Sequence, residues 1–199
     1  RHGPKRPPVA GGALADGSGL LRVARTPGIV EAIAAVAPAL RVEEVDVAGP
    51  PTSATLRAAG WAEAAALLAG ARGSTAPVTG PDGGTAEAEV VDGTIRVRVA
   101  AGDPLDEVVL RSYAIGAAHM AYGLVTGEAL AVDEDGSVQD LTIRSFGVPR
   151  ASDTPRIEVA IDAAAGGPPV NGSDAVFAAV AAAVWLDRGV GPDWPLRGA

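Results

Sequence analysis

The 199-residue chain contains no cysteine, and this absence excludes several kinds of site at once. Disulfides, thiolate zinc sites and cysteine-ligated iron–sulfur clusters all require that side chain. Histidine is scarce as well, with two in the whole chain. The sequence also lacks the P-loop, the G-x-S-x-G turn of serine hydrolases and the H-E-x-x-H helix of zinc proteases. We therefore expect no metal site within the chain itself.

Aromatic residues and positive charges are also few. Aromatic residues make up 4% of the chain against 48% hydrophobic residues, so Val, Leu, Ile and Ala must build the core of a globular domain. Sixteen Lys and Arg face 24 Asp and Glu, and the net charge of −8 argues against a nucleic-acid partner. The longest Ala-rich apolar run, at 175–186, is shorter than a membrane span and indicates a buried helix. With no signal peptide visible, we expect a cytoplasmic protein without a membrane partner.

Glycine and proline divide the chain into segments. Residues 1–18 predict a flexible tail, 73–84 a loop between two lobes, and 192–199 a C-terminal tail. The lobes, 19–72 and 85–191, each run in the order strand, helix, strand, helix. This order predicts an α+β fold built from two related strand–helix–strand–helix layers, although no sequence repeat of fixed period is present.

Apolar spacing and capping residues give the individual elements. Helices are expected at 29–40, 53–71, 106–125 and 174–187, with Thr52 or Ser53 as N-cap of the second. Strands are expected at 19–25, 42–47, 128–133, 138–144 and 156–161.

The local signal for a hairpin is strong at Asp92-Gly93. This dipeptide separates two β-like runs, 85–91 and 94–100, and is typical of a type I′ turn. Alternation then places Ile95, Val97 and Val99 on one face of the strand, which we expect to be the core face.

Four pieces in a fixed order carry a family resemblance. They are a Gly-containing helix at 116–123, a strand and acidic turn at 128–136, Phe146-Gly147-Val148-Pro149, and the run D-T-P-R-I-E-V at 153–159. Together they resemble the C-terminal part of the molybdopterin-binding large subunit of the xanthine dehydrogenase / aldehyde oxidase family. The resemblance extends to most of the chain, from about 16 to 190, and implies the fold of that family's molybdenum-cofactor-binding domain.

The resemblance also implies where a catalytic base would lie. The family uses a glutamate in a G-x-G-E motif before its final helix, and the matching residues here are Asn171, Gly172, Ser173 and Asp174. Asp174 is the candidate base, with a side chain one methylene shorter than glutamate. The same residue also fits an N-cap of the last helix, and this is the interpretation we favour.

The cofactor contacts implied by the resemblance are Thr52, Ser53, Ala54, Gly116 and Gly172. Other family contacts are replaced. Tyr113 stands where the family has glutamine, and Ala117 stands where it has a second glycine. A methyl group at that position would crowd the close approach of a pterin.

Two further features are interpreted without a site. His119 lies in an apolar helix without a second ligand at i±3 or i±4, so we expect a packed core residue. The acidic run at 133–136 lacks the remaining ligands of a calcium loop and predicts a solvated turn.

These observations support two hypotheses about function. The favoured one is a xanthine dehydrogenase-like pseudoenzyme, a non-catalytic or incomplete cofactor-domain homologue that binds no cofactor alone and acts as an interaction or accessory subunit. Its partners would be other subunits of a molybdenum hydroxylase, or further copies of the chain as a homo-oligomer. The alternative is one subunit of a split molybdenum-dependent oxidoreductase, a hydroxylase of aldehydes or N-heterocycles, whose partner chain supplies most of the molybdopterin site. Whether the chain is an enzyme depends on this choice.

Overall fold

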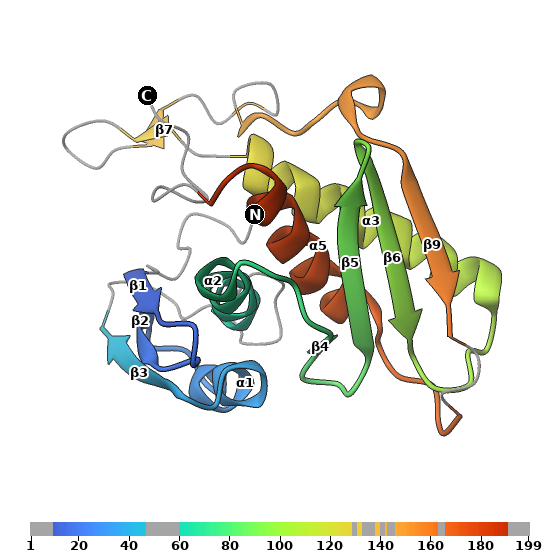
Figure 1. Cartoon of the computed structure of the whole chain (residues 1–199). Coiled ribbons are helices and arrows are strands. Elements are labelled where there is room, and N and C mark those ends of the chain that lie inside the picture. Colours follow the sequence, from blue (N-terminus) through green and yellow to red (C-terminus); the bar gives the residue numbers. More distant parts are fainter. Residues whose placement is uncertain are drawn as a thin grey trace.

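The computed structural model describes residues 10–46, 60–128, 131–132, 138–139, 142, 146–162 and 166–190. Two units with the same order of elements follow each other in the chain (Figure 1). The first contains β1 (Ala10–Ala13), β2 (Gly19–Ala24), α1 (Ile29–Val36), β3 (Leu40–Val45) and α2 (Trp61–Arg72). The second contains β5 (Thr85–Val91), β6 (Thr94–Ala100), α3 (Glu107–Thr126), β9 (Ile157–Ile161) and α5 (Ser173–Asp187). Short pieces lie between these elements: β4 (Val78–Thr79), β7 (Ala131–Val132), β8 (Val138–Gln139) and a 3₁₀ turn, η1 (Ala151–Asp153).

Strand pairing in the two units follows one plan. In the first sheet β2 pairs antiparallel with β1 and parallel with β3, and helix α1 connects the two parallel strands. In the second sheet, ordered β4-β5-β6-β9, β6 pairs antiparallel with β5 and parallel with β9, across α3. The predicted α+β fold of two related layers is therefore confirmed. One difference is that β1 lies inside the expected tail, because residues 10–13 pair with β2.

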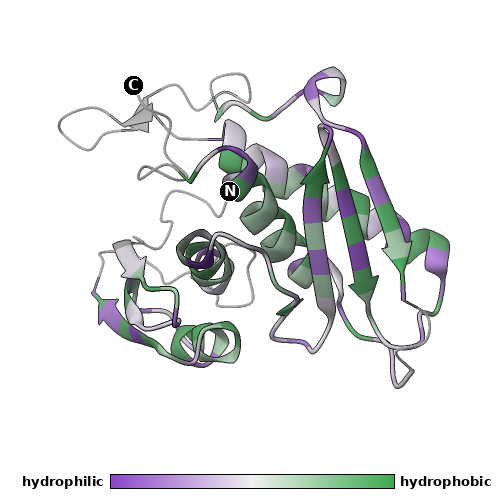
Figure 2. Cartoon of the chain, in the orientation of Figure 1, coloured by the Kyte–Doolittle hydropathy of each residue, from purple (hydrophilic) through white to green (hydrophobic). Residues whose placement is uncertain are grey.

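The predicted hairpin is present in the expected register. Asp92 and Gly93 both have positive φ, 49° and 72°, as a type I′ turn requires, and Val91 pairs with Thr94 across it. Ile95, Val97 and Val99 are buried, while the arginines between them are exposed. Figure 2 shows this alternation as bands of hydrophobic and hydrophilic colour along the strands. The core face predicted from the sequence is thus confirmed.

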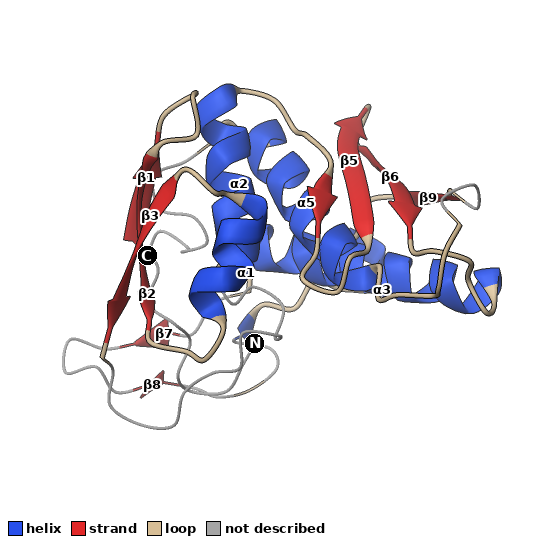
Figure 3. Ribbon diagram, turned by 90° about the horizontal axis from the view of Figure 1, so that it is seen from below, coloured by secondary structure: helices blue, strands red, loops and turns tan. Residues whose placement is uncertain are grey.

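The core centres on α5, which is buried from Ser173 to Trp185. It contacts β5 and β6 on one side, α3 on another and α2 on a third (Figures 1 and 3). A helix that is apolar all round belongs in such an interior position. One continuous hydrophobic cluster joins residues of both units, so the core crosses the loop at 73–84.

The four expected helices are present, but the bounds of two differ clearly from the prediction. Helix α1 was expected over 29–40 and ends at Val36, because Leu40 already begins β3; helix α2 begins later than expected. Helices α1 and α3 begin as predicted, and Asp106 caps α3 by accepting bonds from Val108 N and Val109 N at 2.8 and 3.2 Å. Helix α2 begins at Trp61, because Gly60 has a φ of 89° that no helix accommodates. The predicted cap at Thr52 or Ser53 lies outside the described residues, and a helix running unbroken from 53 is wrong.

Helix α3 has the length and apolar composition of a membrane-spanning helix, although the sequence led us to expect no such segment. Its 20 residues are long and apolar enough to span a membrane, with a mean hydropathy of 1.2 in an 18-residue window. The expectation that no run is long enough was therefore wrong, because it counted only unbroken apolar residues. Length and composition do not separate a membrane helix from a core helix, and α3 packs against α5 and β9.

Candidate functional site

Asp174 lies in the first turn of α5, one residue after the start of the helix. Its side chain is nearly buried, with 9% of its surface exposed. The first turn of a helix favours a carboxylate, because free backbone N–H groups and the helix dipole stabilise negative charge there. Asp174 therefore occupies a position that suits a structural carboxylate.

The interpretation of Asp174 as the N-cap is wrong, because the N-cap is Gly172 and Asp174 lies inside the first turn; a side-chain contact at this terminus comes instead from Asn171, the residue before the N-cap. Asn171 Oδ1 accepts hydrogen bonds from Ser173 N at 3.0 Å and from Ser173 Oγ at 2.7 Å. This role of Asn171 was not predicted from the sequence. The available signal was that asparagine is a preferred cap, like the serine and aspartate that follow it.

Gly172 is required by packing within the chain. A methyl group built on it would lie 2.9 Å from Val99 Cγ2 and 3.1 Å from Ala101 Cβ. Val99 lies on the buried face of β6, and Ala101 is a buried residue directly after that strand. The glycine thus lets the start of α5 lie directly against that strand. This packing gives a reason for Gly172 that involves no ligand.

Gly116 has the opposite environment. A methyl group built there meets no heavy atom within 4 Å, and the residue lies in the middle of α3. Thr52, Ser53 and Ala54 lie outside the described residues. Of the residues implied by the resemblance, the structure brings together only the sequence neighbours Gly172 and Asp174.

The described residues do not fit a pterin or molybdenum site. Gly172 faces β6, Gly116 faces outward, and among the described positions no group of three or more His, Cys, Asp or Glu could hold a metal ion. His119 is half-buried on α3, and the acidic run at 133–136 lies outside the described residues.

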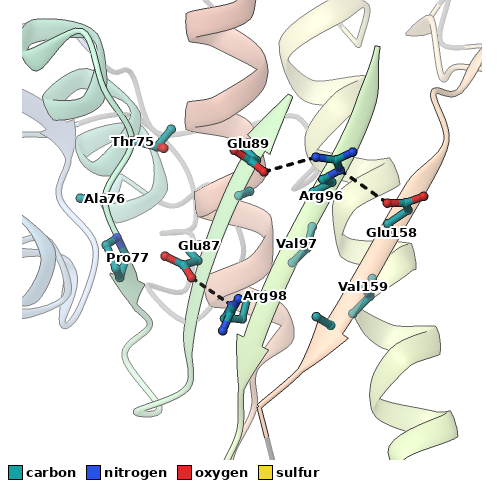
Figure 4. Close-up of a pocket in the computed structure, with 12 residues that line it drawn as sticks. Thr75, Ala76, Pro77, Glu87, Glu89, Arg96, Val97, Arg98, Glu158 and Val159 are labelled. Atoms are coloured by element: carbon teal, nitrogen blue, oxygen red, sulfur yellow. Dashed lines mark ion pairs between the residues drawn. The ribbon is translucent and has the colours of Figure 1, made fainter. Parts of the chain in front are cut away.

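A hollow lies on the opposite face of the second sheet from the helices. Its volume is about 490 Å³, and three strands and the segment before β4 line it (Figure 4). Arg96 stands between Glu89, at 3.9 Å, and Glu158, at 3.6 Å, and Arg98 pairs with Glu87 at 3.2 Å. Each arginine already faces a carboxylate, and all these side chains are substantially exposed. Such surface pairs contribute about 0–1 kcal/mol each, and they present no nucleophile or unpaired cation for chemistry.

A second surface is apolar and lies on α3. Val109, Tyr113, Gly116 and Met120 follow one another at intervals of four, three and four residues, and so lie along one face of the helix. Tyr113 is 62% exposed, Val109 48% and Met120 40%. We call this row the α3 stripe. The buried residues Ala114, Ala117, Ala118, Ala121 and Leu124 lie on the face that adjoins the stripe.

The α3 stripe was not predicted from the sequence, because both faces of α3 are apolar. The signal was present in the spacing, since an a/d-type pattern of four, three and four residues runs separately from the alanines. Periodicity shows that two apolar faces exist but does not show which one meets the core.

Comparisons with known proteins concern the fold alone. No protein-family model matches the chain, and no curated protein sequence matches it. Among solved structures, a Cu,Mo-CO dehydrogenase in its CO-reduced state has 15% sequence identity to this chain and a TM-score of 0.41. The matched region covers 88% of this chain and 34% of the dehydrogenase chain. A reconstituted CO dehydrogenase from Oligotropha carboxidovorans has 14% identity and a TM-score of 0.40, covering 85% of this chain and 32% of its own. Quinoline 2-oxidoreductase from Pseudomonas putida 86 has 11% identity and a TM-score of 0.44, covering 88% and 34%. The chain thus spans about a third of the length of each of these chains.

Proposed function

We propose that the chain is an accessory or interaction subunit, a non-catalytic or incomplete relative of the molybdopterin-binding domain in the xanthine dehydrogenase / aldehyde oxidase family. The observation that carries the proposal is the α3 stripe. Water meets a row of apolar side chains on a helix whose alanine-rich face packs in the core, and such surfaces are typical of protein interfaces.

The stripe has the form of a helix-docking seam. Its spacing of four, three and four residues is that of the a and d positions of helices that pack side by side. Gly116 leaves open space in the middle of the row, where the backbone of a partner helix could approach closely. Tyr113 beside it offers a large amphipathic ring, a residue type enriched at interface hot spots.

The family resemblance names the class of partner. In the resembling family this domain is one part of a longer subunit, so the natural partners are other chains of a molybdenum hydroxylase. The environment of Gly172 supports a role without cofactor binding, because its packing against Val99 and Ala101 accounts for the glycine without a ligand.

Purification of the tagged chain from its native host tests the proposal. We expect wild type to bring with it a molybdenum-containing subunit, detected by mass spectrometry together with molybdenum and pterin analysis. The double variant Tyr113→Ser/Met120→Ser should lose that subunit. The matched control Leu105→Ser removes an even more exposed apolar side chain that lies just before α3, and it should retain the subunit. The proposal is wrong if no such subunit accompanies wild type, or if the stripe variant retains it.

The alternative function, a split molybdenum-dependent oxidoreductase, is favoured by one observation. Asp174 is a nearly buried carboxylate at a helix N-terminus, in the position where the resemblance implies a base. Removal of a positioned general base lowers turnover by about 10² or more. In a reconstituted complex, Asp174→Ser with turnover reduced to that extent and an unchanged melting temperature would favour this alternative. Asp174→Glu should then raise the rate, because it restores the side-chain length of the family.

A further inference from the structure

Strand β9 leaves one edge of the second sheet open. It is the last strand in the order β4-β5-β6-β9, and no described strand pairs with it on the side away from β6. Ile95 N donates to Arg156 O, and Asp162 N donates to Val99 O, so the even-numbered residues from 156 to 162 direct their backbone groups to β6. The backbone groups of Ile157, Val159 and Ile161 therefore point outward.

Little protects this edge within the described part of the chain. Arg111 of α3 donates a hydrogen bond from Nη1 to Val159 O. A carbonyl oxygen has two lone pairs and can accept a second bond. The outward groups of Ile157 and Ile161 have no described partner, and β9 contains no proline or lysine of the kind that commonly blocks an edge.

Helix α3 provides an apolar shelf beside the same edge. Val108 and Ile115 lie three residues before and four residues after Arg111, so they share the face of α3 from which Arg111 reaches β9. Val108 is 77% exposed and Ile115 42%. The N-terminal end of α3 extends past β9 in Figures 1 and 3. A strand added to β9 would cover these side chains from the sheet side.

We propose that the occupant of this edge is a second copy of the chain, with β9 pairing antiparallel to β9 about a two-fold axis at Val159. In this register Ile157 faces Ile161 of the second copy, and Glu158 faces Ala160. Arg156 faces Asp162, so each copy places a cation opposite an anion. The pairing adds up to about six backbone hydrogen bonds, two for each of three hydrogen-bonded residue pairs. It joins two four-stranded sheets into one.

Charge selects this register over its neighbours. A shift of two residues in one direction places Glu158 opposite Glu158, and a shift in the other direction places it opposite Asp162. Like charges directly opposite each other destabilise a strand pair. A shift of one residue would place the apolar face of one strand on the polar face of the other. The strand is therefore complementary to itself about Val159.

With the two-fold axis perpendicular to the sheet, the helices of both copies cover the same face of the joined sheet. The row Ile157, Val159 and Ile161 of one copy then extends over the Val108–Ile115 face of the other. The α3 stripe lies on a different side of α3, because Val109 and Tyr113 are not in the row of Val108, Arg111 and Ile115. Self-pairing and the partner binding proposed above can therefore occur together and fail separately.

Sedimentation velocity of the full chain over a range of concentrations tests for the dimer. We expect wild type to be dimeric and Arg156→Asp to raise the dissociation constant about tenfold or more, because two opposite-charge pairs become like-charge pairs. The exchange Arg156→Asp/Asp162→Arg should restore the dimer. The control Tyr113→Ser should dimerise as wild type does. A monomeric wild type, or a dimer that Arg156→Asp leaves intact, would overturn the proposal.

Cysteine cross-linking tests the register, since the chain has no native cysteine. Glu158 and Ala160 of the second copy form a non-hydrogen-bonded pair with Cα atoms about 4.5 Å apart, within disulfide range. A mixture of Glu158→Cys and Ala160→Cys chains should form a disulfide dimer under mild oxidation, while each variant alone should not. Cross-linking of Glu158→Cys with itself, or no cross-linking in the mixture, would contradict the register.

Discussion

The substitutions Gly116→Ala and Gly172→Ala separate packing from ligand binding as the reason for two glycines that the family resemblance assigns to a cofactor. At Gly172 a new methyl group meets Val99 Cγ2 at 2.9 Å and Ala101 Cβ at 3.1 Å. At Gly116 it meets nothing within 4 Å. The same chemical change should therefore move the free energy of unfolding in opposite directions.

The magnitudes follow from packing and helix propensity. Alanine in a helix interior is favoured over glycine by about 0.8–1 kcal/mol, so Gly116→Ala should stabilise the chain by about that amount. Overpacking of a filled core costs about 1–3 kcal/mol, and the reduced entropy of the unfolded chain returns about 0.4–1 kcal/mol. Gly172→Ala should thus destabilise by up to about 2.6 kcal/mol, and by about 1.3 kcal/mol at the middle of both ranges. For a chain of this size each kcal/mol moves the melting temperature by about 2–4 °C.

Thermal and urea unfolding of the two variants, followed by circular dichroism, measure both effects. We expect Gly116→Ala to melt above wild type and Gly172→Ala to melt below it. The double variant should show the sum of the two shifts, because the sites share no neighbour among the contacts described. A destabilised Gly116→Ala, or a Gly172→Ala that melts with wild type, would refute the packing argument.

Three further predictions concern stability. Val97 is 3% exposed on the core face of β6, so Val97→Asp should cost about 3 kcal/mol or more, and near wild-type melting would show the strand is misplaced. Asn171→Ala should cost about 1 kcal/mol because Ser173 loses the cap on its N–H, whereas Asn171→Asp should be nearly neutral; equal losses in both would contradict the capping role. A chelator should leave the melting temperature of the purified chain unchanged, and a drop of many degrees would reveal a bound metal.

The hairpin and the helices could be predicted because their signals are local. Asp92-Gly93 specifies its turn through positive φ, and the alternation in 94–100 then assigns the core face without reference to other segments. Helix α3 was predictable for the same reason, since Asp106 at its start and the apolar residues that follow are close to one another in the sequence. The order of these elements was enough to give the α+β plan.

Features that depend on distant partners could not be predicted in this way. Residues 10–13 read as a tail because glycine is common there, and they form β1 only because β2 lies beside them. The cap of α5 was assigned to Asp174, although the helix begins one residue earlier, with Gly172 at the N-cap and Asn171 accepting from Ser173 N. The α3 stripe was hidden because its apolar spacing is as regular as that of the buried face. For the candidate site, the sequence identified Gly116 and Gly172 but could not show that one faces solvent and the other faces β6.

The division of the chain at 73–84 remains a prediction about sequence organisation, but the core argues that the two units depend on each other. Helix α2 of the first unit packs on α5 of the second, and both are buried on several sides. Separation at this loop would expose an apolar face of α5 along its length, a loss far larger than the few kcal/mol by which domains are stable. We therefore expect fragments 10–78 and 79–190, expressed alone, to lack cooperative thermal unfolding, and to regain it when they are mixed. A cooperative transition in either fragment alone would show that its half holds a sufficient core, and that the buried contact between α2 and α5 joins two independent domains.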